Sequence, residues 1–484
     1  MRERIPAWQW IAGAIVVFAV CLIGNNTVSL WDRDEPRYAQ TSRQMLQSGD
    51  WVVPHFLDEV REKKPVFIYW CQAAAMAVLG DTAFAARLPS SIFVAITVGV
   101  LIWSMRWSVG RRRALWTGII FATSGLTMAS AKMSITDGVL ILFVTVSQLC
   151  LYAIWRGRGS WGVFIILGLA NGLGILTKGP VVIAVMAVTL IVLLVLRQLS
   201  PRKALTPALS QSTGRGGLGL KSLVSALIAF CVFAPWIYAI EQQREGYLFR
   251  TLREEVFLRI AESKEQHKGP PGYYVLSIAL TFLPWTIFLP HALIRAWRRR
   301  SEPRIRFALA AIIGPWIMFE LIQTKLPHYV LPIYPALAYL VADLLIAGRK
   351  SMRLPLALAG AMVIGVGVIY GLILPNITEL RISIRVGEVL KAQGATKIGD
   401  VIMIKYKEPS LGFYQGGTIR EESDNLFLQH HPAEQWPKWI VLTSDLWAAT
   451  PPEIQQQLDV VATVHGINLA NRLQPVDVMV LRKR

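Results

Sequence analysis

Apolar stretches about as long as a bilayer is thick recur through residues 1–374, and no other feature limits the fold so strongly. They lie at roughly 10–28, 88–105, 114–131, 138–155, 161–177, 180–196, 222–240, 273–294, 307–322, 330–347 and 354–374. Hydrophobic residues make up 54% of the chain, more than a soluble protein of this size would carry. The pattern predicts a polytopic α-helical membrane protein with about eleven transmembrane helices.

Basic residues gather on one set of alternate loops. If the N-terminus is cytoplasmic, the loops on its side contain 22 lysines and arginines against two acids, Glu3 and Glu302. These segments are the N-terminus, 106–113, 156–160, 197–221, 295–306 and 348–353. The positive-inside rule places such loops in the cytoplasm. Because the net charge of +19 is concentrated in these short loops, we expect membrane lipids as neighbours and no nucleic-acid partner.

One apolar segment, 65–79, does not fit this alternation. Counted as a span, it would move the basic run 111–113 to the outside and reverse every later loop. It is also short for a crossing. We therefore expect a helix that lies against the outer membrane surface, with its aromatic side chains at the interface.

With this topology, the unusual polar residues meet at the external face. The first external loop, 29–87, opens with a segment rich in acids and arginines and contains a lysine pair before Pro65. Charges at a membrane surface are costly unless they pair or contact a polar substrate. The residues gathered at this face are Asp34, Glu35, Arg37, Lys63, Lys64, Asp137, Lys178, Arg259, His267, Lys325, His328 and Tyr329. Their convergence favours an enzyme.

The acidic residues also have a structural interpretation. Asp34 could cap a helix that ends near Gly49, with Pro36 in its first turn. That interpretation does not explain why four further charges surround Asp34. Asp137 could likewise cap the helix that follows it, or pair with a nearby cation.

The basic residues allow two interpretations as well. Lys64 and Lys178 could extend toward lipid headgroups, and Tyr329 could anchor its span at the interface. Alternatively, Lys64 could bind the phosphate of a lipid-linked substrate, with Lys325 and Tyr329 lining the same pocket.

The composition changes after about Leu374. Residues 375–484 have ordinary polar sequence with helical patterns such as 452–458. Short apolar runs lie at 401–404, 439–442 and 476–481. We expect a small α/β domain outside the membrane, attached to a membrane domain formed by residues 1–374.

Five short motifs follow one another along the membrane part. They are Asp34-Glu35-Pro36-Arg37-Tyr38-Ala39, Lys64-Pro65 with Tyr69-Trp70, Ala86-Arg87-Leu88-Pro89-Ser90, Thr177-Lys178-Gly179-Pro180 and Lys325-Leu326-Pro327-His328-Tyr329. In this order and at these spacings, they resemble the GT-C membrane glycosyltransferases that use polyprenyl-phosphate sugars. The aminoarabinose transferases acting on lipid A and the protein O-mannosyltransferases are the most similar branches.

The resemblance implies a role for each group of residues. The expected catalytic residues are Asp34, Glu35, Arg37 and Asp137. The expected ligands of the donor phosphate are Lys64, Lys178, Arg259, Lys325 and Tyr329. Asp34 would activate or orient the acceptor, with inversion at the anomeric carbon, while cations stabilise the departing phosphate.

The sequence departs from the aminoarabinose branch at two positions. That branch has a glutamate, which takes part in a metal site, directly before the phosphate-binding lysine. Here Lys63 stands in its place, and Glu254-Glu255-Val256 stands where the branch has a histidine. A zinc site is therefore not expected, and we assign no metal ligand and no cofactor, although a divalent metal stays open.

The sequence thus predicts an inverting glycosyltransferase of the bacterial inner membrane, with its active site and C-terminal domain on the periplasmic side. Its expected partners are a polyprenyl-phosphate-linked sugar donor and a lipid or protein acceptor. A transporter or flippase of lipid-linked sugars is the alternative, but transporters place polar sites near the bilayer midplane. A non-catalytic scaffold would leave the charge cluster of the first external loop unexplained.

Overall fold

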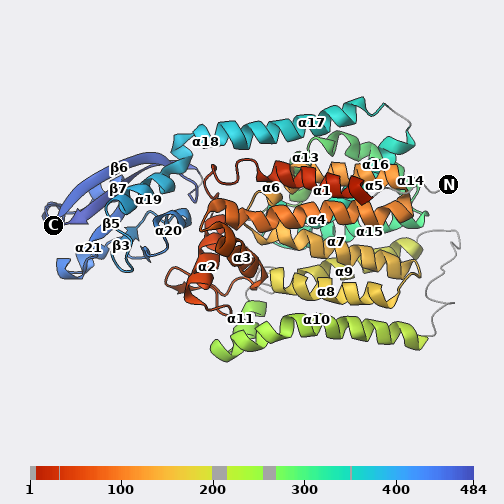
Figure 1. Ribbon diagram of the computed structural model, residues 1–484, viewed down its shortest axis with the longest axis horizontal. Coiled ribbons are helices and arrows are strands. Elements are labelled where there is room, and N and C mark those ends of the chain that lie inside the picture. The colour runs from red at the N-terminus through yellow and green to blue at the C-terminus, as the bar shows by residue number, and fades with distance from the viewer. Residues whose placement is uncertain (1–6, 32, 199–214, 254–268, 349–350, 472) are drawn as a thin grey trace.

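The structure is a computed structural model that describes residues 7–31, 33–198, 215–253, 269–348, 351–471 and 473–484. It consists of a bundle of long helices with a β-sheet domain at one end (Figure 1). The bundle helices are α1 Ala7–Leu22, α4 Ala83–Val109, α5 Arg111–Ala122, α6 Gly125–Ala131, α7 Thr136–Trp155, α8 Trp161–Lys178, α9 Val181–Gln198, α10 Arg215–Gln243, α13 Tyr273–Thr281, α14 Leu289–Arg298, α15 Pro303–Leu321, α16 Tyr334–Ala347 and α17 Arg353–Val368.

The expected number of eleven spans is not confirmed. By length and composition, seven helices in the described ranges could cross a membrane, or up to nine if each of two bent pairs is one span. The bent pairs are α5 with α6, at 65°, and α13 with the segment Trp285–Arg298, at 117°. Two other expected stretches form α1, which has 16 residues, and α15, which carries Arg304, Arg306 and Glu320. Helix α1 is too short, and α15 carries too many charges, to count as a candidate span.

The core of the bundle is apolar and continuous. Its largest buried cluster joins side chains of α4, α5, α7, α9, α15 and α16. Gly314 of α15 allows a close approach to α9, because an added Cβ would lie 2.6 Å from the backbone oxygen of Val188. By contrast, only 6% of the apolar window in 353–376 is buried, so α17 lies at the outside of the bundle.

The loop 29–87, which the sequence predicts to be external, folds at the end of the bundle nearest the sheet (Figure 1). It contains α2 Asp34–Ser48, the short hairpin strands β1 His55–Phe56 and β2 Glu59–Val60, and α3 Phe67–Leu79. The expected helix over 65–79 is therefore present, with 13 residues or about 20 Å, too short for a crossing. Helix α2 begins at Asp34 itself, with Arg33 at the cap position, and ends at Gly49 in the left-handed conformation, φ 72°.

The C-terminal residues form a five-stranded mixed sheet in the order β4-β3-β5-β7-β6. The strands are β3 Val401–Ile404, β4 Arg420–Glu422, β5 Trp439–Thr443, β6 Leu458–Asn468 and β7 Gln474–Lys483. The expected strands correspond to β3, β5 and β7. The helical pattern at 452–458 is only partly right, because α23 covers Pro452–Gln455 and Leu458 begins β6.

Helix α2 joins the two parts of the molecule. It packs against α3 on one side and against α20 Pro409–Gln415 of the C-terminal domain on the other. The buried guanidinium of Arg43 donates to the carbonyl oxygens of Gly412 and Phe413, at 3.3 and 2.9 Å. Phe56 and Leu57 also belong to a buried cluster formed mainly by the C-terminal domain. The sheet domain therefore fixes the position of α2.

Candidate active site

A cavity of about 780 Å³ opens among α7, α8, α9, α10 and α15. Among the residues that the structure describes, its charged lining side chains are Lys63, Lys64, Asp137 and Lys178. Most of the remaining lining is apolar: Leu140, Ile175, Leu176, Val181, Ala184, Val188, Ile191, Val192, Phe233, Trp236, Ile237, Leu248, Ile317, Met318, Phe319, Leu321, Ile322 and Pro332. Such a cavity suits an amphipathic ligand with an anionic head.

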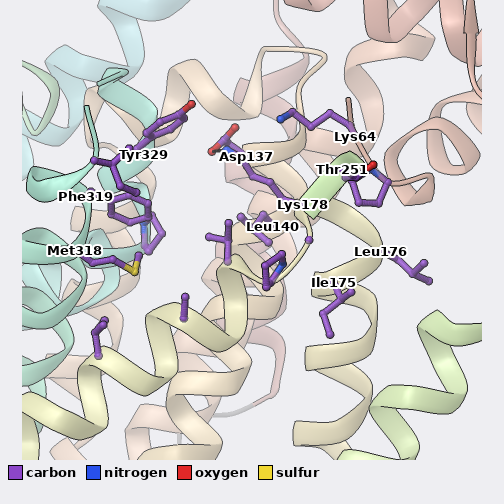
Figure 2. Close-up of a pocket in the computed structure, with 18 of the residues that line it drawn as sticks. Lys64, Asp137, Leu140, Ile175, Leu176, Lys178, Thr251, Met318, Phe319 and Tyr329 are labelled. Atoms are coloured by element: carbon purple, nitrogen blue, oxygen red, sulfur yellow. Dashed lines mark hydrogen bonds and ion pairs between the residues drawn. The ribbon is translucent and has the colours of Figure 1, made fainter. Parts of the chain in front are cut away.

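Asp137 lies at the centre of the charged end. Its carboxylate accepts from the Lys178 ammonium at 2.7 Å and lies 3.8 Å from His328 Nε2. The Lys178 ammonium also lies 5.0 Å from the centre of the Tyr329 ring, a cation–π distance. Figure 2 shows Lys64 on the other side of Asp137, with its ammonium directed toward the carboxylate.

The loop that carries the lysine pair is held in place by an ion-pair network. Glu62 pairs with Arg244 at 2.8 Å and with Arg250 at 3.4 Å, at the end of α10 and in α11 Tyr247–Leu252. These pairs attach the residue before Lys63 to the helices that form the opposite wall of the cavity. These ion pairs thus hold the lysine pair at the cavity.

Asp34 lies beside the cavity rather than in its lining. Its half-exposed carboxylate is 3.9 Å from the buried guanidinium of Arg61. Arg61 also donates to the Tyr69 hydroxyl at 3.0 Å and lies 5.0 Å from the centre of the Tyr38 ring. Burial raises the pKa of Tyr38 well above its usual value, and Tyr69, Asp34 and Asp137 reinforce the shift. One buried phenol therefore lies within the fields of both carboxylates.

Glu35 is fully buried in a different environment. Its two oxygens accept from Arg87 Nε at 2.9 Å and Nη2 at 2.8 Å, and from the backbone N–H groups of Trp31 and Ser134, both at 2.6 Å. Arg87 further donates to three backbone carbonyl oxygens of residues 25–29. The carboxylate thus joins α2, α4 and the chain before α7, and its four hydrogen bonds leave no side open to a substrate.

Sequence comparison relates this chain to lipid-linked sugar transferases. The model of the dolichyl-phosphate-mannose-protein mannosyltransferase family matches residues 7–244. The undecaprenyl phosphate-alpha-4-amino-4-deoxy-L-arabinose arabinosyl transferase of Serratia proteamaculans is 33% identical over 349 residues, which are 71% of this chain and 60% of that protein. Its counterpart in Yersinia enterocolitica is 32% identical over 335 residues, 68% and 58% of the two chains. The matched region thus spans about 60% of the length of these relatives.

Solved structures show the same architecture. The structure of ArnT from Cupriavidus metallidurans bound to undecaprenyl phosphate superposes with a TM-score of 0.76, covering 98% of this chain and 97% of that one at 19% identity. The oligosaccharyltransferase AglB from Archaeoglobus fulgidus gives 0.54 at 10% identity, covering 91% and 70%. This chain has the GT-C fold.

The GT-C chain brings together only some of the residues expected at its site. Lys64, Asp137, Lys178 and Tyr329 line the cavity. Arg259 lies outside the described residues. The remaining expected residues, Asp34, Glu35, Arg37 and Lys325, are not among the lining residues.

The contacts of two expected residues explain their positions. Arg37 lies over the Phe56 ring, 6.0 Å from its centre, on the side of the C-terminal domain. Burial raises the pKa of Glu421 in that domain, and the charge of Arg37 partly opposes the shift. Lys325 is buried and donates to Glu320 at 2.7 Å and to the carbonyl oxygen of Pro270 at 3.2 Å.

Two residues at the site were not assigned roles from the sequence. Lys63 was placed at the external face and noted as a departure from the aminoarabinose branch, but it was assigned no role; it lines the cavity. Arg61 stands two positions earlier, and its basic character was the only available signal. Its contacts with Asp34 and Tyr38 arise from the hairpin β1–β2 that returns the chain toward α2.

In the part of the chain that the structure describes, the residues do not fit the zinc site of the aminoarabinose branch. Within the described ranges, no group of three or more His, Cys, Asp and Glu side chains could hold a metal ion. At the cavity, the position that would supply a carboxylate ligand is occupied by Lys63, and the one carboxylate among the described lining residues, Asp137, is paired with Lys178. We therefore route no step of the chemistry through a metal.

Proposed function

We propose that this GT-C protein is an inverting glycosyltransferase that moves a sugar from a polyprenyl phosphate, such as undecaprenyl phosphate, to an extracytoplasmic acceptor. Lipid A, a protein or a glycan would be suitable acceptors. The observation that carries the proposal is the cavity with three lysines at one end and an otherwise mostly apolar lining. A phosphate and an isoprenoid chain require these two environments in one continuous site.

The chemistry needs one base and a set of cations. In the proposed reaction, an acceptor hydroxyl gives its proton to the Asp34 carboxylate while its oxygen bonds to the anomeric carbon. The bond from that carbon to the phosphate oxygen breaks, and the phosphate leaves with the electron pair. Lys64 and Lys178 stabilise the growing charge of the phosphate, while Tyr329 positions Lys178 through its ring.

Three of the residues expected at the site receive other roles in this proposal. Glu35 holds α2 against α4 through Arg87, and so positions its neighbour Asp34. Arg37 contributes to the junction with the C-terminal domain. Lys325 fixes the start of α13 to the end of α15 through Glu320, which also accepts from the backbone N–H of Gly272 at 2.7 Å.

The basic loops support an orientation in the bacterial inner membrane. By the positive-inside rule, the basic ends of α4, α14 and α17 would lie in the cytoplasm and the loop 29–87 in the periplasm. Residues 1–374 would then form the catalytic membrane domain and 375–484 a periplasmic domain that supports α2. Accessibility of single introduced cysteines to a membrane-impermeant thiol reagent tests this orientation.

Transfer from radiolabelled undecaprenyl-phosphate sugars to a membrane lipid extract tests the function itself. We expect the purified wild-type protein to move the label. Asp34→Asn should abolish transfer while changing undecaprenyl-phosphate binding by less than about twofold, and Lys64→Ala should weaken that binding at least about tenfold.

Asp58→Asn is the matched control. Asp58 lies on the same loop, is 55% exposed against 53% for Asp34, and pairs with Arg420 at 3.7 Å, but we assign it no chemistry. Equal transfer by wild type and Asp34→Asn would remove Asp34 from catalysis. Movement of the donor across liposomes without any transfer would favour a flippase instead.

A further inference from the structure

The charged end of the cavity carries more positive charge than one phosphodiester requires. The described cations at this end and in the pairs around it are Arg61, Lys63, Lys64, Lys178, Arg244 and Arg250. The described carboxylates are Asp34, Glu62, Asp137 and Glu241, and Glu241 accepts from the backbone N–H of the lining residue Leu248. Among the described residues that line the cavity itself, three lysines face one carboxylate, Asp137, and the rest of the lining is mostly apolar, so the surplus acts strongly on a charged ligand.

Two of these carboxylates are already paired with cations other than Lys63. Asp137 is 2.7 Å from the Lys178 ammonium, and Glu62 lies between Arg244 and Arg250. Lys63 takes part in no ion pair within the described residues, and its side chain is exposed where it lines the cavity. It is thus a cation presented to whatever occupies the mouth of the cavity.

The proposed donor has only one phosphate charge. A sugar joined to a prenyl phosphate is a phosphodiester with a single negative charge, which Lys64 and Lys178 can meet. We infer that the sugar of the donor is acidic, with a carboxylate such as that of a uronic acid, and that Lys63 binds this carboxylate. The inference rests on the proposed function and specifies its substrate class.

The same charges select against a basic sugar. An ammonium group on the sugar would enter a site with surplus positive charge and would be repelled by Lys63. The relatives with aminoarabinose in their names act on a sugar of this kind, so the inference separates this chain from them in specificity.

Lys63 could instead act on the phosphate, which gains a second charge as it leaves. The two roles predict different behaviour. If Lys63 acts on the phosphate, Lys63→Gln should weaken the binding of bare undecaprenyl phosphate and of every donor by the same factor. If Lys63 binds a sugar carboxylate, Lys63→Gln should leave the binding of bare undecaprenyl phosphate nearly unchanged and should reduce only the preference for acidic sugars.

Competition against radiolabelled undecaprenyl phosphate on the full-length protein measures this preference without an acceptor. The competitors are undecaprenyl-phosphate uronic acids and neutral hexoses of matched stereochemistry, in both the gluco and galacto series, together with the 4-amino-4-deoxyarabinose donor. We expect a uronic acid to bind at least about tenfold more tightly than its hexose partner in one of the series.

The variants assign this preference to Lys63. Lys63→Gln should reduce the preference for the uronic-acid donor over its matched hexose to below about threefold, and Lys63→Arg should retain this preference. Lys397→Gln, at an exposed lysine of the C-terminal domain, should leave the ratio at its wild-type value.

Three results would overturn the inference while leaving the proposed function intact. They are equal binding of acid and hexose in both series, a ratio unchanged by Lys63→Gln, and tighter binding of the amino sugar than of either uronic acid. If undecaprenyl phosphate itself does not bind, or binds equally to Lys64→Ala, the proposed function fails and the inference fails with it.

Discussion

Replacing the carboxylate by an amide should have opposite effects at two adjacent acids, Asp34 and Glu35: loss of activity at the first and loss of stability at the second. Asp34 is half-exposed beside Arg61, whereas Glu35 is fully buried and bonded to Arg87. We therefore expect Asp34→Asn to abolish transfer without loss of stability. Glu35→Gln should instead destabilise the protein, and should reduce activity only in proportion to the folded protein that is lost.

The structure sets the size of the Glu35 effect. The carboxylate accepts four hydrogen bonds, two of them from the Arg87 guanidinium. Glutamine offers a single acceptor oxygen, and its amide group faces donors, so Arg87 becomes a buried charge without a counterion. Breaking a buried ion pair by removal of one partner costs about 3–5 kcal/mol. That shifts the folding equilibrium by roughly two to four orders of magnitude.

The assay is thermal inactivation in detergent, followed as a half-life because membrane proteins often unfold irreversibly. The half-life of Glu35→Gln should fall steeply relative to wild type, while transfer per folded molecule stays within about threefold. Arg87→Met serves as the partner control, since it leaves the carboxylate buried and unpaired and should be similarly destabilised. A Glu35→Gln protein of wild-type stability and no activity would refute the structural role and restore the catalytic role that the sequence suggested.

Three further outcomes follow from the contacts. Lys178→Met should weaken undecaprenyl-phosphate binding at least about tenfold in equilibrium competition, because Asp137 then faces the phosphate without its 2.7 Å partner. Arg43→Met should loosen α20 from α2 by about 1.5–3 kcal/mol, visible as faster protease cleavage of the C-terminal domain; unchanged cleavage would contradict this coupling. Burial raises the pKa of Glu408 from 4.5 to about 6, so its folded state holds a proton more tightly than the unfolded chain. The stability that Glu408 contributes is full below pH 4.5 and is lost as the pH rises through 6. Glu408→Gln should therefore stabilise the protein by about 2 kcal/mol at pH 8, seen as a higher melting temperature. At pH 4.5 the melting temperature should not rise.

Local patterns were sufficient to predict much of the fold. The length of the apolar stretches and the alternation of basic loops indicated a helical membrane protein. The loop charges also identified 65–79 as a helix that does not cross, and the structure has α3 at Phe67–Leu79. The three apolar runs after residue 375 became β3, β5 and β7, since short strands bounded by polar residues carry a local signal.

Pairings between distant residues could not be predicted in the same way. Glu35 was assigned to catalysis because nothing in its own surroundings shows that Arg87, 52 positions later, occupies its carboxylate. A pairing between near neighbours was missed as well: Lys325 was assigned to the phosphate pocket, but Glu320, five residues earlier at the end of α15, binds it. The count of spans was not predicted either, because two of the expected stretches are pairs of helices bent by 65° and 117°.

The central claim is that a polyprenyl phosphate occupies the cavity headed by Lys64, Asp137 and Lys178. An electron cryo-microscopy structure of the full-length protein with undecaprenyl phosphate tests it most directly. We predict phosphate density between Lys64 and Lys178, and isoprenoid density along the apolar faces of α9, α10 and α15. A second apolar groove of about 580 Å³ lies between α1 and α4 and has no charged residue in its described lining. Lipid density in that groove, with none beside Lys64, would contradict the claim.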